Sequence, residues 1–183
     1  YTGNTSTGTT ISSLDFAPNM VWFKSRTQAE NHQIYDSVRG VTKRIIPNGT
    51  QAEATASTGL TNFDSNGFRT GGENETDSGN IVAWNWKAGT SFTNDASATG
   101  IGSIDSAGSV NTDAGFSIIS YTGTGANATI AHGLGSVPKM YIARNIDDVE
   151  QWTTYHVGIG ATHHLRLNTT DAKDTYAMIN NTS

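Results

Sequence analysis

Short apolar runs, separated by polar turns, organise the whole chain. Met20–Lys24 is apolar up to a final cation. In Ile81–Lys87, alternation places Val82, Trp84 and Trp86 on one face of a strand. Runs of four to eight residues bounded by Gly, Asn, Ser and Pro predict β-strands. We expect strands at 9–14, 20–24, 32–36, 42–46, 81–87, 116–121, 129–131, 139–144, 151–156, 163–167 and 176–179. This spacing predicts an all-β fold, an antiparallel β-sandwich such as a jelly roll.

A hairpin and a helical turn complete the predicted elements of the first hundred residues. Residues 60–63 and 68–70 flank the sequence Asp64-Ser65-Asn66-Gly67, and an Asn-Gly pair supplies the positive φ that a tight hairpin turn requires. Residues 51–58 (QAEATAST) are the only stretch that favours a helical turn, and 71–80 has the composition of an acidic, glycine-rich loop. Trp22, Trp84 and Trp86 lie in apolar strands and are expected to pack in the core.

The sequence matches itself when it is shifted by 120 residues. Tyr1-Thr2-Gly3 recurs as Tyr121-Thr122-Gly123, and the match continues without a gap. Matched pairs include Pro18 with Pro138, Met20 with Met140, Lys24 with Arg144, Glu30 with Glu150, Tyr35 with Tyr155 and Asn48 with Asn168. A period of this length is close to the size of a small domain and predicts a tandem repeat of about 120 residues.

The repeat divides the chain into three parts. We predict a first repeat at 1–98 that lacks its opening strand, a linker with an edge strand at 99–115, and a second repeat at 116–183 that is truncated at its C-terminal end. Within the linker, 101–104 is the expected edge strand. On this hypothesis the sequence is a fragment, about one and a half repeats, of a longer chain.

Composition narrows the classes of function. Thr, Ser and Gly number 27, 17 and 20, a mixture that favours strands and turns over helices. There is no Cys, which excludes disulfides and thiol chemistry. The net charge of −5 argues against nucleic-acid binding, and no apolar run is long enough to insert into a membrane.

The sequence offers little catalytic chemistry, and we predict that the protein is not an enzyme. There is no Gly-x-Ser-x-Gly motif, and the carboxylates are scattered. The adjacent His163 and His164 would point to opposite faces of a strand, so we expect no shared metal. Asp64 and the Asp147-Asp148 pair could ligate calcium, but turn and loop roles explain them better. We therefore expect no cofactor and no metal.

Aromatic and polar residues near Trp152 form the best candidate binding site. Trp152, Tyr155 and His156 lie in a polar setting where an aromatic ring could stack on a sugar or fill an interface between protomers. His32 stands at the equivalent of Trp152 in the first repeat, and Arg39 follows Asp36 in a turn. The simplest role of Arg39 is that of a salt-bridged or capping residue.

Several motifs also carry a family resemblance. They are 18–24 (PNMVWFK), 35–40 (YDSVRG), 64–68 (DSNGF), 82–89 (VAWNWKAG), 111–125 (NTDAGFSIISYTGTG), 132–139 (HGLGSVPK) and 165–170 (LRLNTT). Together they resemble a domain of unknown function that is repeated in virion proteins of tailed bacteriophages, especially marine ones. The resemblance implies a concanavalin-A-like or SPRY-like sandwich and a structural or tail-fibre role.

These observations lead to three functional hypotheses. The first is a surface-exposed, extracellular tail fibre or appendage of a phage virion, with lectin-like binding to host-surface glycans. Its partners would be copies of itself, other virion proteins and a host glycan. The second is a purely architectural protein that decorates a capsid or forms a filament. The third is a secreted bacterial adhesin or carbohydrate-binding module.

Overall fold

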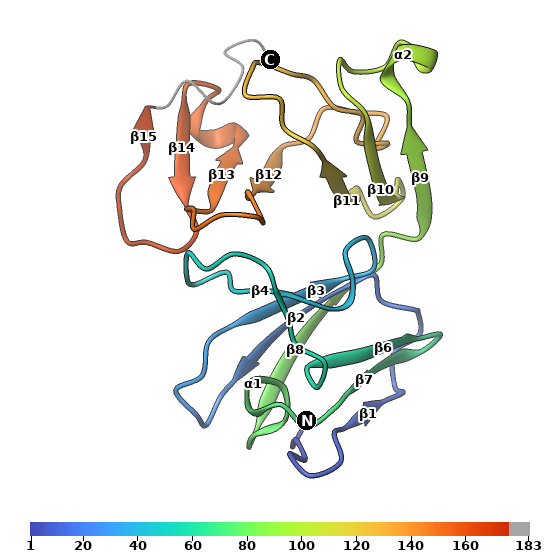
Figure 1. Ribbon diagram of the computed structural model, residues 1–183, viewed down its shortest axis with the longest axis vertical. Coiled ribbons are helices and arrows are strands. Elements are labelled where there is room, and N and C mark those ends of the chain that lie inside the picture. The colour runs from blue at the N-terminus through green and yellow to red at the C-terminus, as the bar shows by residue number, and fades with distance from the viewer. Residues whose placement is uncertain (176–183) are drawn as a thin grey trace.

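The first half of the chain contains a five-stranded antiparallel sheet. A computed structural model describes residues 1–175 of the protein (Figure 1). The strands of this sheet stand in the order β5 (Ala54–Thr55), β4 (Gly40–Ile45), β3 (Gln33–Asp36), β2 (Met20–Ser25) and β8 (Ile81–Trp86). All neighbouring strands are antiparallel. The strand predicted at 20–24 is therefore confirmed, as the second strand from one edge of the sheet.

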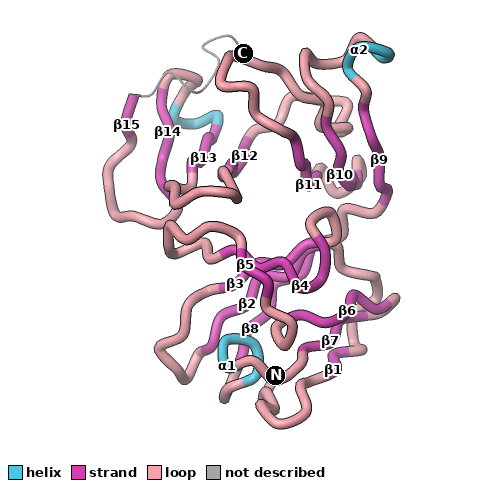
Figure 2. The backbone as a smooth tube through the Cα atoms, in the orientation of Figure 1, coloured by secondary structure: helices cyan, strands magenta, loops and turns pink. Residues whose placement is uncertain are grey.

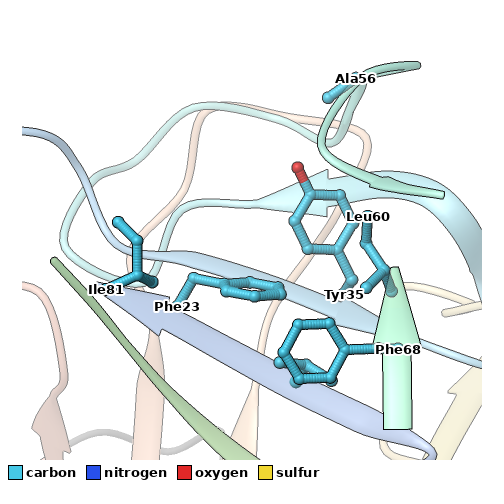
Figure 3. Close-up of a cluster of buried hydrophobic side chains, with 7 residues drawn as sticks. Phe23, Tyr35, Ala56, Leu60, Phe68 and Ile81 are labelled. Atoms are coloured by element: carbon cyan, nitrogen blue, oxygen red, sulfur yellow. The ribbon is translucent and has the colours of Figure 1, made fainter. Parts of the chain in front are cut away.

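A second, smaller sheet covers one face of the first. It consists of β1 (Thr10–Ile11), β7 (Gly67–Thr70) and β6 (Leu60–Asp64), and the short helix α1 (Asn74–Asp77) follows β7. Val21, Phe23 and Tyr35 of the larger sheet meet Leu60 and Phe68 of the smaller one in a buried cluster (Figure 3). The rings of Phe23 and Phe68 contact edge to face at 5.3 Å. Full burial of each such side chain contributes about 1.5–3 kcal/mol, so this cluster is the main stabilising core of the first half.

The second half of the chain holds two more sheets. The first contains β9 (Thr90–Asn94), β10 (Ser106–Asn111) and β11 (Phe116–Tyr121), with the short helix α2 (Ala96–Thr99) after β9. Because β10 pairs with both β9 and β11, it is the middle strand of its sheet. The edge strand predicted at 101–104 is thus misplaced: that stretch forms bends, and the strand begins at Ser106 and is not at an edge.

The other sheet of the second half has four strands. They follow the order β12 (Met140–Ala143), β13 (Thr153–His156), β14 (His163–Arg166) and β15 (Asp174–Thr175), with a 3-10 turn at Val157–Ile159. The structure has no strand at the predicted position 129–131, and the strand predicted at 176–179 lies outside the described residues. Strands and loops make up nearly all of the described chain, and the helix colour marks α1, α2 and the 3-10 turn beside β13 (Figure 2). The fold is all-β and antiparallel, as predicted.

The strands of the two halves pair in the same way, with residue numbers that differ by 120. Met20 pairs with Asp36 and Met140 pairs with His156, so both partners are 120 residues higher in the second half. The same holds for the other three β2–β3 and β12–β13 pairs. It also holds for β4–β5 and β14–β15, where Lys43 pairs with Thr55 and His163 with Thr175. The two groups of four strands therefore share both strand order and register.

Loop hydrogen bonds repeat with the same offset. Lys24 donates to the carbonyls of Gln28 and Glu30, and Arg144 donates to those of Asp148 and Glu150. The side-chain oxygen of Asn48 accepts from the backbone of His32 at 3.0 Å, and Asn168 accepts from Trp152 at 3.1 Å. These contacts fix the loops that follow β2 and β12 in the same way.

The predicted hairpin of 60–63 and 68–70 is confirmed as β6 and β7, but the helical turn at 51–58 and the positive φ at the hairpin turn are wrong. Residues 51–58 form no helical turn, because Ala54–Thr55 pairs as β5 with β4. The hairpin turn before β7 contains no residue with positive φ. Gly67 is required there for space: a Cβ atom would lie 1.7 Å from the carbonyl oxygen of Ile11 in β1.

The tryptophans divide between buried and exposed positions. Trp84 is 46% exposed and contacts Trp22 edge to face at 6.2 Å, so the expectation that it packs in the core is wrong. The core side of β8 carries Ile81 and Ala83 instead. Trp86 stacks on Phe116 of β11 at 6.2 Å and so connects the two halves of the chain.

Candidate functional site

Trp152 is the centre of a junction between the two halves. It precedes β13, is 4% exposed, and packs in a cluster with Ile34 and Ile45 of the first half. Its indole N–H donates to the carbonyls of Ile46 at 3.0 Å and Gly49 at 3.1 Å. A buried indole N–H needs such partners, because an unsatisfied donor would cost about 1–3 kcal/mol.

Arg144, directly after β12, holds the same first-half loop. Its guanidinium donates to the carbonyls of Thr50 and Gln51, both at 2.6 Å, and lies 5.4 Å from the Trp152 ring centre. Burial lowers the pKa of this guanidinium, and the carboxylate of Glu150 opposes that shift. An arginine remains charged in such a setting, so these are charge-assisted hydrogen bonds that exceed neutral ones in strength.

Backbone hydrogen bonds complete the junction. The amide of Glu53 donates to the carbonyl of Ile146 at 2.7 Å, and the amide of Glu150 donates to that of Thr50 at 3.1 Å. The junction therefore joins residues 46–53 of the first half to 144–152 of the second. Neither Arg144 nor the 46–53 loop is identified as part of a site from the sequence alone. One signal was available: Arg144 aligns with Lys24, so both halves carry a cation at this position.

Trp152 and Tyr155 do not form one site. Their positions three residues apart place them on opposite faces of an extended strand. Tyr155 stacks on Tyr141 of β12, with ring centres 5.1 Å apart, and Tyr141 is 37% exposed. Because Trp152 is buried, its ring can stack on a sugar only if the junction opens, and its contacts are with the first half of the same chain rather than with another protomer.

His156 and His32 both accept hydrogen bonds through Nδ1. His156 is exposed and accepts from the backbone of Gly158 at 3.0 Å, just as Asp36 accepts from Val38 in the first half. His32 accepts from the indole of Trp22 at 2.9 Å. Burial, and then the positive charge of Lys24, lower the pKa of His32. The neutral imidazole is the form that this hydrogen bond requires.

Arg39 is held in an ion-pair network within the first half. It contacts Asp36 at 2.6 Å and Glu53 at 3.0 Å, and its side chain is 10% exposed. It also donates to the carbonyls of Lys43 and Ile34. All three of its nitrogens are engaged, so Arg39 contributes to the fold by bracing β3 and β4 against Glu53, which itself lies in the junction.

The buried Asp77 and the partly buried Glu73 of the first half are also satisfied by structural partners. Glu73 accepts from Arg44 at 2.7 Å and from the Tyr35 hydroxyl at 3.3 Å. Burial raises the pKa of Glu73, and Arg44 opposes that rise. Asp77 accepts hydrogen bonds from the hydroxyls of Thr9, Thr70 and Thr76 and the amide of Gly72. Across residues 1–175, no three His, Asp or Glu side chains gather as a metal site would require.

Comparison with known proteins identifies a family. The model of a domain of unknown function, DUF7483, matches residues 1–183. The chain belongs to the DUF7483 family. Neither the curated proteins nor the solved structures contain a significant match to this DUF7483 chain. Within the described residues of the DUF7483 domain, no helix is long and apolar enough to cross a membrane.

Proposed function

We propose that this DUF7483 chain is a non-enzymatic structural component of a bacteriophage virion, exposed on a tail fibre or similar appendage. The proposal is supported by the sequence motifs that resemble phage virion proteins. It is also supported by the polar residues Arg39, Glu73 and Asp77, whose bonds all serve packing of the fold. The partners of the chain are copies of itself and other virion proteins, and its location is the virion surface.

We further propose that the chain is built from tandem β-sandwich repeats of about 120 residues, of the jelly-roll or concanavalin-A-like type. The constant offset between β2–β5 and β12–β15 in strand register supports this proposal. The repeated loop bonds of Lys24 and Arg144 support it independently, because hydrogen bonds to loop carbonyls do not follow from strand register alone.

The observation that carries the structural role is the junction around Trp152. One buried indole and one guanidinium from the second half bind four carbonyls of a first-half loop. A junction of this kind fixes the orientation of consecutive repeats relative to one another. Consecutive units with fixed orientation are what a rigid appendage requires, whereas a flexible linker would let them rotate.

Electron cryo-microscopy of the intact particle tests this role. Density for the chain on a tail or projecting fibre would agree with the appendage proposal. Density spread over the capsid lattice or along a continuous filament would contradict it and would leave the purely architectural role. Absence of the chain from purified particles would contradict both and would favour a secreted adhesin or carbohydrate-binding module.

A lectin-like activity is the second candidate, and one observation favours it. Tyr141 and Tyr155 form a partly exposed aromatic stack, and His156 beside them is exposed. Aromatic faces next to polar groups suit the apolar side of a sugar ring. A host-envelope glycan array would test it, with Tyr155→Ala as the loss-of-binding variant and Trp84→Ala, at an exposed aromatic residue of β8, as the control. A flat profile for the unaltered chain would exclude this activity.

A further inference from the structure

Two strands of the second half each have one edge without a strand partner. Among residues 1–175, β12 pairs only with β13, and β11 pairs only with β10. Both are therefore end strands of their sheets. Figure 1 shows the sheets in the order β15, β14, β13, β12 and then β11, β10, β9 across the upper part of the molecule. Unpaired backbone edges of this kind readily accept another strand.

The first half shows what lies on the equivalent edges. The outer edge of β2, the counterpart of β12, pairs with β8 over six residues, from Met20 with Trp86 to Ser25 with Ile81. The other edge of β8 meets Tyr1, the counterpart of Tyr121 at the end of β11. Tyr1 and Ile81 exchange two backbone hydrogen bonds at 2.9 and 2.8 Å, and Thr2 bridges to Asn80. One strand, β8, is thus bound on both sides by the counterparts of β12 and β11.

Exposure of apolar side chains marks the same two strands. Val21 and Phe23 of β2 are 0% exposed. In contrast, Met140, Tyr141 and Ile142 of β12 are 52%, 37% and 39% exposed, and Tyr121 of β11 is 48% exposed. The face that carries Val21 and Tyr35 in the first half is covered by β6 and β7, whereas Tyr141 and Tyr155 lie uncovered in the described residues. Because neighbouring residues of a strand point to opposite faces, β12 exposes apolar side chains on both faces beside its open edge, and exposed apolar surface of this kind marks an interaction site.

We propose that β11 and β12 are the two sides of one strand-binding slot. Its occupant is an antiparallel strand with the sequence pattern of β8, carried by the same polypeptide 120 residues after β8 and thus beyond Ser183. The strand completes a continuous sheet from β15 to β9, and the hairpin that precedes it covers Tyr141 and Tyr155. This inference is based on the unpaired edges of β11 and β12 and on the exposed apolar side chains of these two strands. It rests on the tandem repeat proposed above and is independent of the virion role.

An extended chain tests the slot. Ser183 is equivalent to Phe63, so residues 64–88 of the first half are appended directly after Ser183 as a surrogate for the occupant. Hydrogen–deuterium exchange of β11 and β12 is then compared with that of the 183-residue chain. We expect exchange at both strands to slow at least ten-fold. The matched control is the same extension carrying Ala83→Pro, which cannot form a central strand and is expected to give no protection.

Substitutions on the receiving strand provide a second measurement. Tyr141→Glu in the extended chain is expected to remove the protection of β11 and β12, because it places a charge under the added hairpin. Val149→Glu is the control, since Val149 is 73% exposed and lies in a loop. Both residues are already exposed to solvent, so the 183-residue variants are expected to fold.

Three outcomes would overturn the proposal. Unchanged exchange at β11 and β12 in the extended chain would show that the slot does not take this strand. Protection of β12 without β11 would show that the two edges do not belong to one slot. Protection of β12 in the 183-residue chain that disappears on dilution, together with a dimer in analytical ultracentrifugation, would identify a second copy as the occupant. None of these readouts depends on where the chain lies in a virion.

Discussion

Trp152 holds the two halves of the molecule together through its indole ring and N–H. The same groups would serve in a ligand-binding site, so the sequence alone does not distinguish the two roles. Its polar neighbours in sequence, Gln151 and Thr153, suggest an exposed ring. The structure buries the ring against Ile34 and Ile45 and satisfies its N–H with two carbonyls. Polar neighbours in a strand point to the other face or outward, so they report little on the burial of the residue between them.

Truncation of Trp152 is expected to destabilise the protein strongly. Trp152→Ala removes a large buried side chain and should cost about 3–5 kcal/mol of unfolding free energy. Trp152→Phe keeps most of the apolar area but removes the indole donor from the part-buried carbonyl of Gly49, at a cost of about 1–3 kcal/mol, while the Ile46 carbonyl keeps its bond from the Gly49 amide. Urea unfolding measures both. Trp84→Ala is the control, because Trp84 is 46% exposed; an equal loss at both positions would contradict the junction.

His32 should make stability depend on pH. Its pKa lies below the ordinary value of 6.5 in the folded state, first because of burial and then because of Lys24. The unfolded state therefore takes up the proton first as the pH falls. The stability that neutral His32 contributes is present above pH 6.5 and is lost as the pH falls from there through the folded-state pKa.

The difference between the unaltered chain and His32→Gln isolates this effect. Gln can still accept the hydrogen bond from Trp22 but does not titrate. We expect the unfolding free energy of the unaltered chain to decline relative to the variant as the pH falls below 6.5. Parallel pH profiles for the two proteins would show that the imidazole is not coupled to folding.

At the scale of elements, the strands are predictable from sequence and their connections are less so. The runs that form β2, β8 and β11 are apolar enough to bury on at least one side, so their patterns identify them within about two residues. Residues 51–58 resemble a helix by propensity, but pairing with β4 overrides it. Residues 129–131 have strand-favouring side chains but form no strand, because the local sequence pattern carries no information on the partner that a strand needs.

The hairpin of β6 and β7 shows how a correct residue can be predicted for the wrong reason. The Asn-Gly pair predicts positive φ at Gly67, yet the role of Gly67 is to let the backbone of β1 approach. Sequence offers no sign of this, because β1 is more than fifty residues away along the chain. The close approach binds the smaller sheet together.

Gly67→Ala is therefore expected to destabilise the protein although Ala suits the backbone angles. The added Cβ would lie 1.7 Å from the Ile11 carbonyl oxygen, and β1 must move away. Overpacking of this kind costs about 1–3 kcal/mol. Thermal and urea unfolding measure the loss. Gly123→Ala is the matched control, because a Cβ at Gly123 would meet nothing within 4 Å and the φ of Gly123 is not positive; similar losses would contradict the steric explanation.

At the scale of the whole molecule, the junction couples two unequal halves. The first half has a buried cluster between two sheets. The second half has no comparable cluster among its described residues and shares its largest buried side chain, Trp152, with Ile34 and Ile45. The second half therefore depends on the first for part of its stability. The 120-residue match in sequence indicates this equivalence of halves, but it does not indicate that they touch.

Loss of Arg144 is expected to uncouple the halves. Arg144→Ala removes the charge-assisted bonds to Thr50 and Gln51 and the contact with Trp152. We expect differential scanning calorimetry to show the second half melting first, as a separate transition at lower temperature. Arg26→Ala is the control, since Arg26 is exposed. A single, unshifted transition in Arg144→Ala would contradict the coupling.

The acceptors of the junction are main-chain carbonyls of Ile46, Gly49, Thr50 and Gln51. Substitution of side chains along 46–51 leaves those oxygens in place wherever the backbone path is kept. In the second half, the junction depends on the side chains of Arg144 and Trp152. The junction should therefore tolerate side-chain changes along 46–51 that keep the backbone path, whereas a change at either Arg144 or Trp152 removes side-chain donors that no other described residue of the second half replaces there.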